Sequence, residues 1–228
     1  MKFLTLIILL FSLQIMGQSD FEKAENLFQQ EKYNQAKVLF EKYLKANPNS
    51  YKAIEYLGDI AGHQKKWDEA LKQYKILKNQ FPKTANYFYK YGGALGMKAK
   101  SVNKFKALGM IDEVENSFLT AAKLDPKHID SRWALVMLYL ELPGIVGGSE
   151  NKANKYSDEL MNLSKVDGYL SKGYIDEYFN RYNKAEGNYI KAHEIGNSKT
   201  TFQKLYNLYL NKIKDKSKAQ KLKEKFEK

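Results

Sequence analysis

Apolar side chains recur along this chain at steps of three and four residues, as in Ala36, Phe40 and Tyr43, with lysine and asparagine between them. Such a period places the apolar side chains on one face of an α-helix. Pro48 and Pro82 follow two of these stretches, and proline ends a helix and begins a turn. The pattern predicts an all-α chain of short helices.

The same sequence pattern occurs three times: an aromatic residue, a polar pair, an alanine, and a second aromatic residue four positions later. Its copies begin at Tyr33, Trp67 and Tyr182, and the first two are 34 residues apart. We expect the polar residue after the first aromatic to cap each helix. These residues are Asn34, Asp68 and Asn183. The alanine is small enough to let another helix approach closely.

These copies resemble the tetratricopeptide repeat, a helix–turn–helix unit of about 34 residues. Its first helix, here called helix A, is matched by Leu57-Gly58-x2-Ala61 and Tyr91-Gly92-x2-Leu95. The fifth helix A is the weakest match, because Asp176 occupies an apolar position. The resemblance implies a right-handed α-solenoid. We place five repeats at 17–50, 51–84, 85–128, 129–165 and 166–198, with a capping helix pair at 199–228.

The N-terminal residues read as a secretory signal peptide over 1–17. Lys2 is followed by an apolar run from Phe3 to Leu13 and by Gly17, a small residue that suits cleavage. A short membrane anchor or a buried helix is the alternative, but the run is shorter than the ~20 residues that span a bilayer. With no cysteine for lipid attachment, we expect a periplasmic or secreted protein.

Composition excludes several kinds of chemistry. The chain has no cysteine, three scattered histidines and a net charge of +12. Its cations are almost all lysine, whereas arginine dominates specific contacts to nucleic acid, so nucleic-acid binding is disfavoured. No paired-histidine or other metal-ligand spacing is present. We therefore expect no cofactor and no metal, and a small-molecule substrate is also disfavoured.

Two repeats are longer than the period, each between helix A and helix B. In the third repeat, we expect the added residues to lengthen helix A until Gly109. The fourth repeat gains a loop that runs from Leu142 to Ser149. Neighbouring inserts are expected to form one lip from residues 98–110 and 142–150, as inserts on a binding side do. The candidate lip residues are Phe105, Leu108, Pro143, Gly144, Gly147, Gly148 and Ser149.

The glycine loop has a simple structural interpretation. Pro143 ends helix A, the glycines make the turn and Ser149 caps the next helix. The loop also resembles a Pro-Gly-x-x-Gly-Gly-Ser segment of uncharacterised bacterial envelope repeat proteins. Ser149 and Lys152 match the S-x-x-K pattern of serine acyl enzymes, but so short a pattern arises often by chance. We expect neither catalysis nor anion binding here.

The resemblance implies a concave groove lined by positions 2, 5, 9 and 12 of the A helices, which include Leu140 in the fourth repeat and Leu170 in the fifth. In this chain, these positions hold acidic residues in the first two repeats. In the third and fourth repeats they include glycines and aromatic residues. Trp133 and Met137 are equally consistent with a groove and with a buried core. The candidate groove residues are Glu25, Glu55, Asp59, Tyr89, Gly93, Trp133, Met137 and Tyr174.

The sequence thus predicts a non-enzymatic scaffold, exported to the bacterial envelope, that binds a protein or peptide in its groove. A first alternative is a structural subunit of an envelope or outer-membrane assembly, acting through convex or terminal surfaces. A remote alternative is a serine hydrolase that uses Ser149 and Lys152. The repeat pattern does not identify the partner, because many unrelated functions share it.

Overall fold

The computed structural model describes residues 20–226, and the predicted signal peptide at 1–17 lies outside them. Within this range all regular elements are helices, which confirms the predicted all-α fold class. The chain divides between Ser117 and Phe118 into two compact units. We call residues 20–117 the N-terminal unit and residues 118–226 the C-terminal unit.

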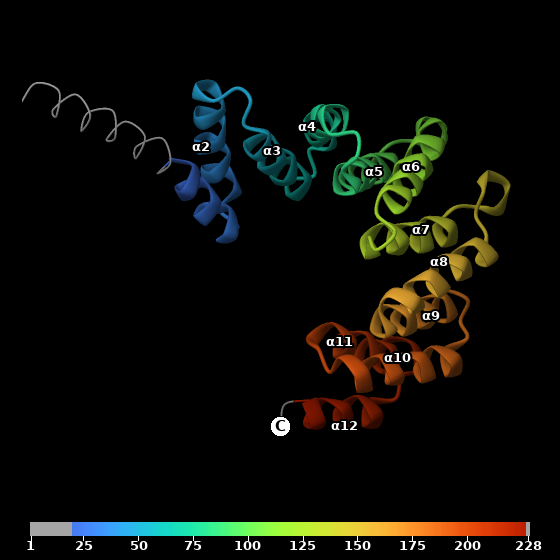
Figure 1. The fold of residues 1–228 in the computed structure, drawn as a ribbon. Helices are drawn as coiled ribbons and strands as arrows, with labels where there is room; N and C mark the ends of the chain where they lie inside the picture. The colour runs from blue at the N-terminus through green and yellow to red at the C-terminus, as the bar shows by residue number, and fades with distance from the viewer. Residues whose placement is uncertain (1–19, 227–228) are drawn as a thin grey trace, which may run out of the picture. The chain divides into compact units, whose positions relative to one another are not determined.

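The N-terminal unit consists of successive antiparallel helices (Figure 1). It begins with a helical segment over residues 20–29, followed by α2, α3, α4 and α5. α6 crosses the division between the units. The bounds are Tyr33–Ala46 for α2, Tyr51–His63 for α3, Trp67–Gln80 for α4, Ala85–Ser101 for α5 and Lys104–Leu124 for α6.

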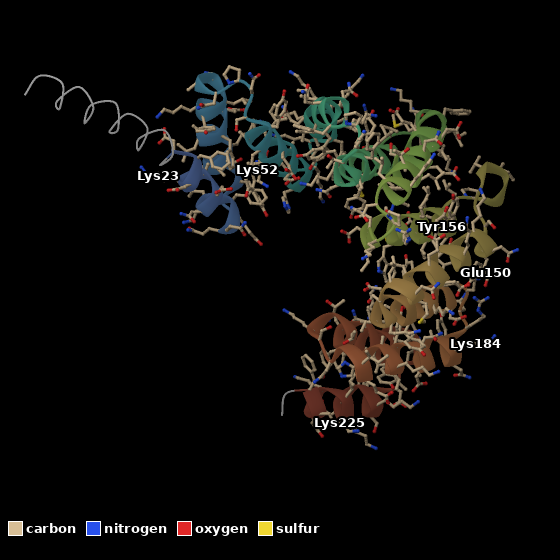
Figure 2. The ribbon with its side chains drawn as sticks, viewed as in Figure 1. Lys23, Lys52, Glu150, Tyr156, Lys184 and Lys225 are labelled. Atoms are coloured by element: carbon tan, nitrogen blue, oxygen red, sulfur yellow. The ribbon has the colours of Figure 1, made fainter. Side chains whose placement is uncertain are left out.

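The C-terminal unit continues the same arrangement, and each helix from α7 to α11 packs on the next. Two short irregular elements interrupt it, a 3-10 turn over Gly144–Val146 and a π-helical turn over Leu208–Ile213. The helices are α7 Ile129–Glu141, α8 Glu150–Leu163, α9 Lys165–Tyr178, α10 Tyr182–Gly196, α11 Lys199–Asn207 and α12 Lys216–Phe226. Tyr156 of α8, labelled in Figure 2, stacks on Tyr139 of α7 with ring centres 5.9 Å apart.

The repeated alanines and aromatics form the core, as the sequence predicts. Ala36, Ala70 and Ala185 are fully buried. The aromatic ring that follows each alanine lies against the small residue of its own helix A. A Cβ added to Gly58 would lie 2.7 Å from Tyr74, and one added to Gly173 would lie 2.4 Å from Tyr189. These glycines are required because any side chain would collide with a buried ring.

The predicted helix caps are wrong. α2, α4 and α10 begin two residues earlier than expected, and their N-cap residues Lys32, Lys66 and Arg181 make no side-chain cap hydrogen bond. A left-handed residue reverses the chain just before each helix. These residues are Glu31, Lys65 and Asn180, with φ of 58° to 59°. The reversal already fixes the helix start, and the Asn34 side chain instead accepts a hydrogen bond from Gln64 Nε2 at 2.8 Å.

The insert of the third repeat lengthens both helices, and the predicted helix end at Gly109 is wrong. α5 ends at Ser101, and Asn103 caps α6 by accepting a hydrogen bond from the backbone N–H of Lys106 at 3.0 Å. Gly109 lies inside α6 with nothing within 4 Å of its side-chain position. An exposed glycine costs a helix only about 1 kcal/mol, so a capped start outweighs it.

The glycine loop of the fourth repeat has the expected structure. α7 ends at Glu141, just before Pro143, and Ser149 caps α8 by accepting a hydrogen bond from the Lys152 backbone N–H at 3.2 Å. Gly147 has a φ of 99°, which favours glycine. A Cβ on Gly148 would lie 1.8 Å from the Leu142 carbonyl oxygen, so no side chain fits there.

Candidate binding face

The helical segment 20–29, α3 and α5 of the N-terminal unit present the side chains predicted to line a groove. We call this surface the A-face. Its centre is an ion cluster in which Lys90 Nζ of α5 lies 2.7 Å from Glu55 Oε1 and 2.7 Å from Asp59 Oδ1 of α3. All three side chains are largely buried. The predicted acidic lining is therefore matched by a cation from the neighbouring helix A.

Tyrosine hydroxyls also donate hydrogen bonds to carboxylates of the A-face. Tyr56 donates to Glu25 Oε1 at 2.9 Å, and Tyr74 donates to Asp59 Oδ1 at 2.6 Å. Burial, reinforced by the bond to Glu25, raises the pKa of Tyr56 to about 12. Burial and the nearby charge of Asp59 raise the pKa of Tyr74 further. Both phenols therefore stay protonated and hold the carboxylates in place at neutral pH.

Beside this polar cluster, two glycines leave the helix backbone bare. Gly93 of α5 has nothing within 4 Å of its side-chain position, and for Gly62 of α3 the nearest atom is the Tyr74 hydroxyl at 3.9 Å. Gly62 borders an open depression of about 290 Å³. The other lining residues are Phe28, Asp59, His63 and Tyr74. The A-face thus combines exposed backbone, aromatic edges and a fixed polar cluster.

Tyr89 lies one turn before Gly93 on α5 and is half-buried. This position places an aromatic ring beside the exposed backbone at Gly93. Within the N-terminal unit, the structure therefore brings five of the candidate groove residues onto three helices. They are Glu25, Glu55, Asp59, Tyr89 and Gly93.

In the C-terminal unit two of the equivalent positions belong to the core, and a third packs against it. Trp133 of α7 packs against the buried cluster around Tyr189, and its indole N–H donates to Asp167 Oδ1 at 2.8 Å. Leu140 and Leu170, at two further groove positions, are buried. Trp133 therefore packs on one side and is partly exposed, and its place in a groove stays a prediction.

The other two candidates of this unit remain accessible. Met137 is 40% exposed on α7. Tyr174 of α9 is half-buried, and Lys204 Nζ lies 5.2 Å from the centre of its ring. Burial raises the pKa of Tyr174, so this hydroxyl is also neutral at physiological pH.

The candidate lip residues separate into structural and exposed side chains. Pro143, Gly144, Gly147, Gly148 and Ser149 form the turn described above. Phe105 and Leu108 of α6, by contrast, are 88% and 48% exposed. The two inserts lie in different units, so their meeting in one lip stays a prediction.

The geometry at Ser149 does not support catalysis. Its hydroxyl oxygen accepts the N–H that begins α8, and the Lys152 ammonium lies 4.8 Å from the centre of the Tyr139 ring. Within residues 20–226 no group of three or more potential metal ligands comes together. In the same range, no helix is long and apolar enough to cross a membrane.

Sequence reasoning missed the cation at the centre of the A-face. Lys90 lies 35 residues after Glu55 and 31 after Asp59, close to the 34-residue period. Side chains at such separations lie on adjacent A helices, so this spacing was the available signal. The donors Tyr56 and Tyr74 were missed as polar groups because their rings fit the apolar pattern.

Comparisons with known proteins agree with this architecture. Residues 17–90 match the family model described as tetratricopeptide repeat. No curated protein matches the chain at a significant level. Among solved structures, TTC0263, a thermophilic repeat protein of Thermus thermophilus, is 17% identical with a TM-score of 0.69, covering 85% of this chain and 99% of that one.

Two further structures are similar over most of the chain. PilW, described as a widely conserved type IV pilus biogenesis factor, is 14% identical with a TM-score of 0.66, covering 93% of this chain and 92% of its own. YrrB, described as having an unusual peptide-binding site, is 15% identical with a TM-score of 0.52, covering 80% and 87%. The chain therefore has the tetratricopeptide-repeat fold, and over residues 17–90 it also matches that family in sequence.

Proposed function

We propose that this protein is a non-enzymatic scaffold that binds a peptide or protein segment on the A-face of its N-terminal unit. The observation that carries the proposal is the bare backbone at Gly62 and Gly93, beside aromatic rings and a fixed polar cluster. YrrB, described as having an unusual peptide-binding site, shares the fold and supports this proposal.

The physical basis of the proposal is that a ligand can approach the helix backbone closely without rearranging the side chains of the A-face. A glycine on an accessible helix face lets a ligand backbone or side chain reach the helix itself. The ring edges of Phe28 and Tyr74 supply apolar contact at the depression. Lys90 offsets one of the two negative charges of Glu55 and Asp59, and the pairing holds all three side chains in place before a ligand binds.

The matched test uses two glycines that are equally open in the free protein. Gly93→Leu fills the A-face, whereas Gly187→Leu adds the same side chain at an open, exposed position of α10. Neither leucine meets a protein atom at its Cβ, so both variants should fold. Peptides selected on the wild-type protein from a random library should bind Gly93→Leu at least about tenfold more weakly, a change of about 1.4 kcal/mol.

The Gly187→Leu variant should bind these peptides as the wild type does. Equal affinity for wild type and Gly93→Leu, or a library that yields no binding peptide, would contradict the proposal. Thermal melting followed by circular dichroism should show that both variants are folded, so that any loss of affinity arises from the change in the binding face.

We further propose export to the envelope, on the basis of the apolar run from Phe3 to Leu13 and the small residue Gly17. Expression in a bacterium with two membranes, followed by osmotic shock, should release a protein whose N-terminus begins near Gln18. An uncleaved chain retained with the cytoplasmic fraction would contradict export and leave the peptide-binding proposal intact.

A structural role in an envelope assembly is the second candidate. It is favoured by the likeness to PilW, described as a pilus biogenesis factor, and by the exposure of Ile145 (96%) at the tip of its loop. A stable complex that survives Gly93→Leu but is lost with Ile145→Ser would select this role over A-face binding.

A further inference from the structure

The turns between helices A and B of the N-terminal unit form a continuous edge. Asn34 after the first turn binds Gln64 before the second, and Asp68 after the second binds Lys98 before the third. A depression of about 380 Å³ joins the second and third turns, with Trp67 and Val102 among its lining residues. We call this surface the A–B edge.

The third turn carries an apolar tip on this edge. Phe105, in the first turn of α6, is 88% exposed, and Leu108 is 48% exposed three residues later. Met97, near the end of α5, is also exposed. An aromatic side chain this exposed leaves nearly all its apolar area in water, and burying it elsewhere would be favourable.

Lysines dominate the charge around this tip, and the acidic Asp68 on the neighbouring turn is paired with Lys98. Between Lys98 and Ile111 the sequence contains four lysines and no acidic residue. Lys104 and Lys106, which flank Phe105, are exposed, and neither makes an ion pair with any residue of the described range. Lys65, on the neighbouring turn, is exposed as well.

We propose that the A–B edge of the N-terminal unit docks on an anionic phospholipid surface, with Phe105 and Leu108 entering the interfacial region. Lysine ammonium groups reach the headgroup phosphates while their alkyl stems lie along the apolar boundary. Each lysine near an anionic leaflet adds attraction, and a buried aromatic ring adds to it independently of salt. The proposal does not depend on peptide binding at the A-face.

Charge complementarity and shape favour a lipid surface over a protein partner. Phe105 is 88% exposed in the first turn of α6, whereas protein hot spots are typically set in well-packed pockets. A lysine-rich rim around an apolar tip, with no acidic residue from Lys98 to Ile111, suits an anionic bilayer. A second copy of this chain, itself strongly basic, would bring like charges together.

The test is sedimentation of the protein lacking residues 1–17 with vesicles. Anionic vesicles contain phosphatidylethanolamine and phosphatidylglycerol, and neutral ones contain phosphatidylcholine alone. We expect binding to the anionic vesicles only, weakened by high salt. Phe105→Ser with Leu108→Ser, and separately Lys104→Glu with Lys106→Glu, should each lower the partition coefficient at least about tenfold.

Matched controls come from exposed residues elsewhere. Val38→Ser on α2 removes a side chain that is 63% exposed, and Lys221→Glu with Lys225→Glu makes the same charge reversal on α12. These variants should retain most of the vesicle binding. In a Phe105→Trp variant, brominated lipid should quench the added fluorescence.

The proposal is overturned if the wild type does not bind anionic vesicles, or if the A–B edge variants bind as well as the controls. It is also overturned if ultracentrifugation shows a dimer that Phe105→Ser dissociates, because the occupant would then be a second copy. Loss of vesicle binding with unchanged peptide affinity separates this surface from the A-face.

Discussion

The A helices of the two units use equivalent positions differently. In the N-terminal unit these positions hold the carboxylates paired with Lys90 and bare glycines such as Gly93, and none of those described is buried. In the C-terminal unit Leu140 and Leu170 are buried and Trp133 packs against the core, while Met137 and Tyr174 stay accessible. The repeat pattern therefore determines how helices pack within a repeat and leaves the face free to become a binding surface or additional core.

The largest predicted effect is a difference in the free energy of unfolding between a substitution at Trp133 and one at Tyr89. Trp133→Ala removes a packed ring and leaves the Asp167 carboxylate without its indole donor. We expect it to lower the free energy of unfolding by about 3 kcal/mol. Tyr89→Ala, on the open face, should cost less than about 1 kcal/mol. Urea unfolding measures both, and equal losses would contradict the contrast between the faces.

The next prediction concerns a glycine–tyrosine contact that recurs in the core of each unit. Gly58→Ala and Gly173→Ala both push a methyl group into a buried tyrosine ring. Each should lower the free energy of unfolding by about 1–3 kcal/mol. Gly93→Ala is the control, because its methyl group meets no atom within 4 Å and alanine favours the helix. Thermal unfolding of all three variants would reveal any asymmetry between the cores.

A smaller effect is expected from the polar cluster of the open face. Lys90→Met removes the cation between Glu55 and Asp59 and leaves two carboxylates facing each other. Because the group is not fully buried, we expect a loss of about 1–2 kcal/mol. Lys52→Met, a control at a residue labelled in Figure 2, removes a 3.7 Å contact to Glu55 and a cation–π contact to the Tyr56 ring, and because Lys52 is exposed it should be near neutral.

The smallest effect is a pH dependence confined to the C-terminal unit. Burial lowers the pKa of His193, so the folded state favours its neutral form. The unfolded state takes up a proton first as the pH falls below about 6.5, and the free energy of unfolding then decreases until the folded pKa is passed. Hydrogen exchange, corrected for intrinsic rates, should show α10 losing protection over this window, and His193→Gln should remove the change.

The sequence was sufficient to predict the packing within each repeat. It was insufficient to predict the contacts between neighbouring repeats. The alanines, Gly58 and Tyr74 were predictable because each contact lies within one helix pair. The caps at Asn34 and Asp68 were mispredicted because the chain reverses through a left-handed residue before each helix. The residue types at those positions do not indicate a left-handed conformation. Lys90 was missed because its partners lie on the preceding helix A. Its role follows from the packing of two repeats, and periodicity within one repeat does not reveal it.

The central claim, that the A-face binds a partner segment, is tested most directly by photo-crosslinking in living cells. A benzophenone amino acid replaces Tyr89 on the A-face or, as the control, Val38 on α2, which is 63% exposed. We predict a discrete crosslinked product from position 89 that Gly93→Leu abolishes and Gly187→Leu preserves, with none from position 38. Equal products from both positions, or a product at position 89 that persists with Gly93→Leu, would contradict the claim.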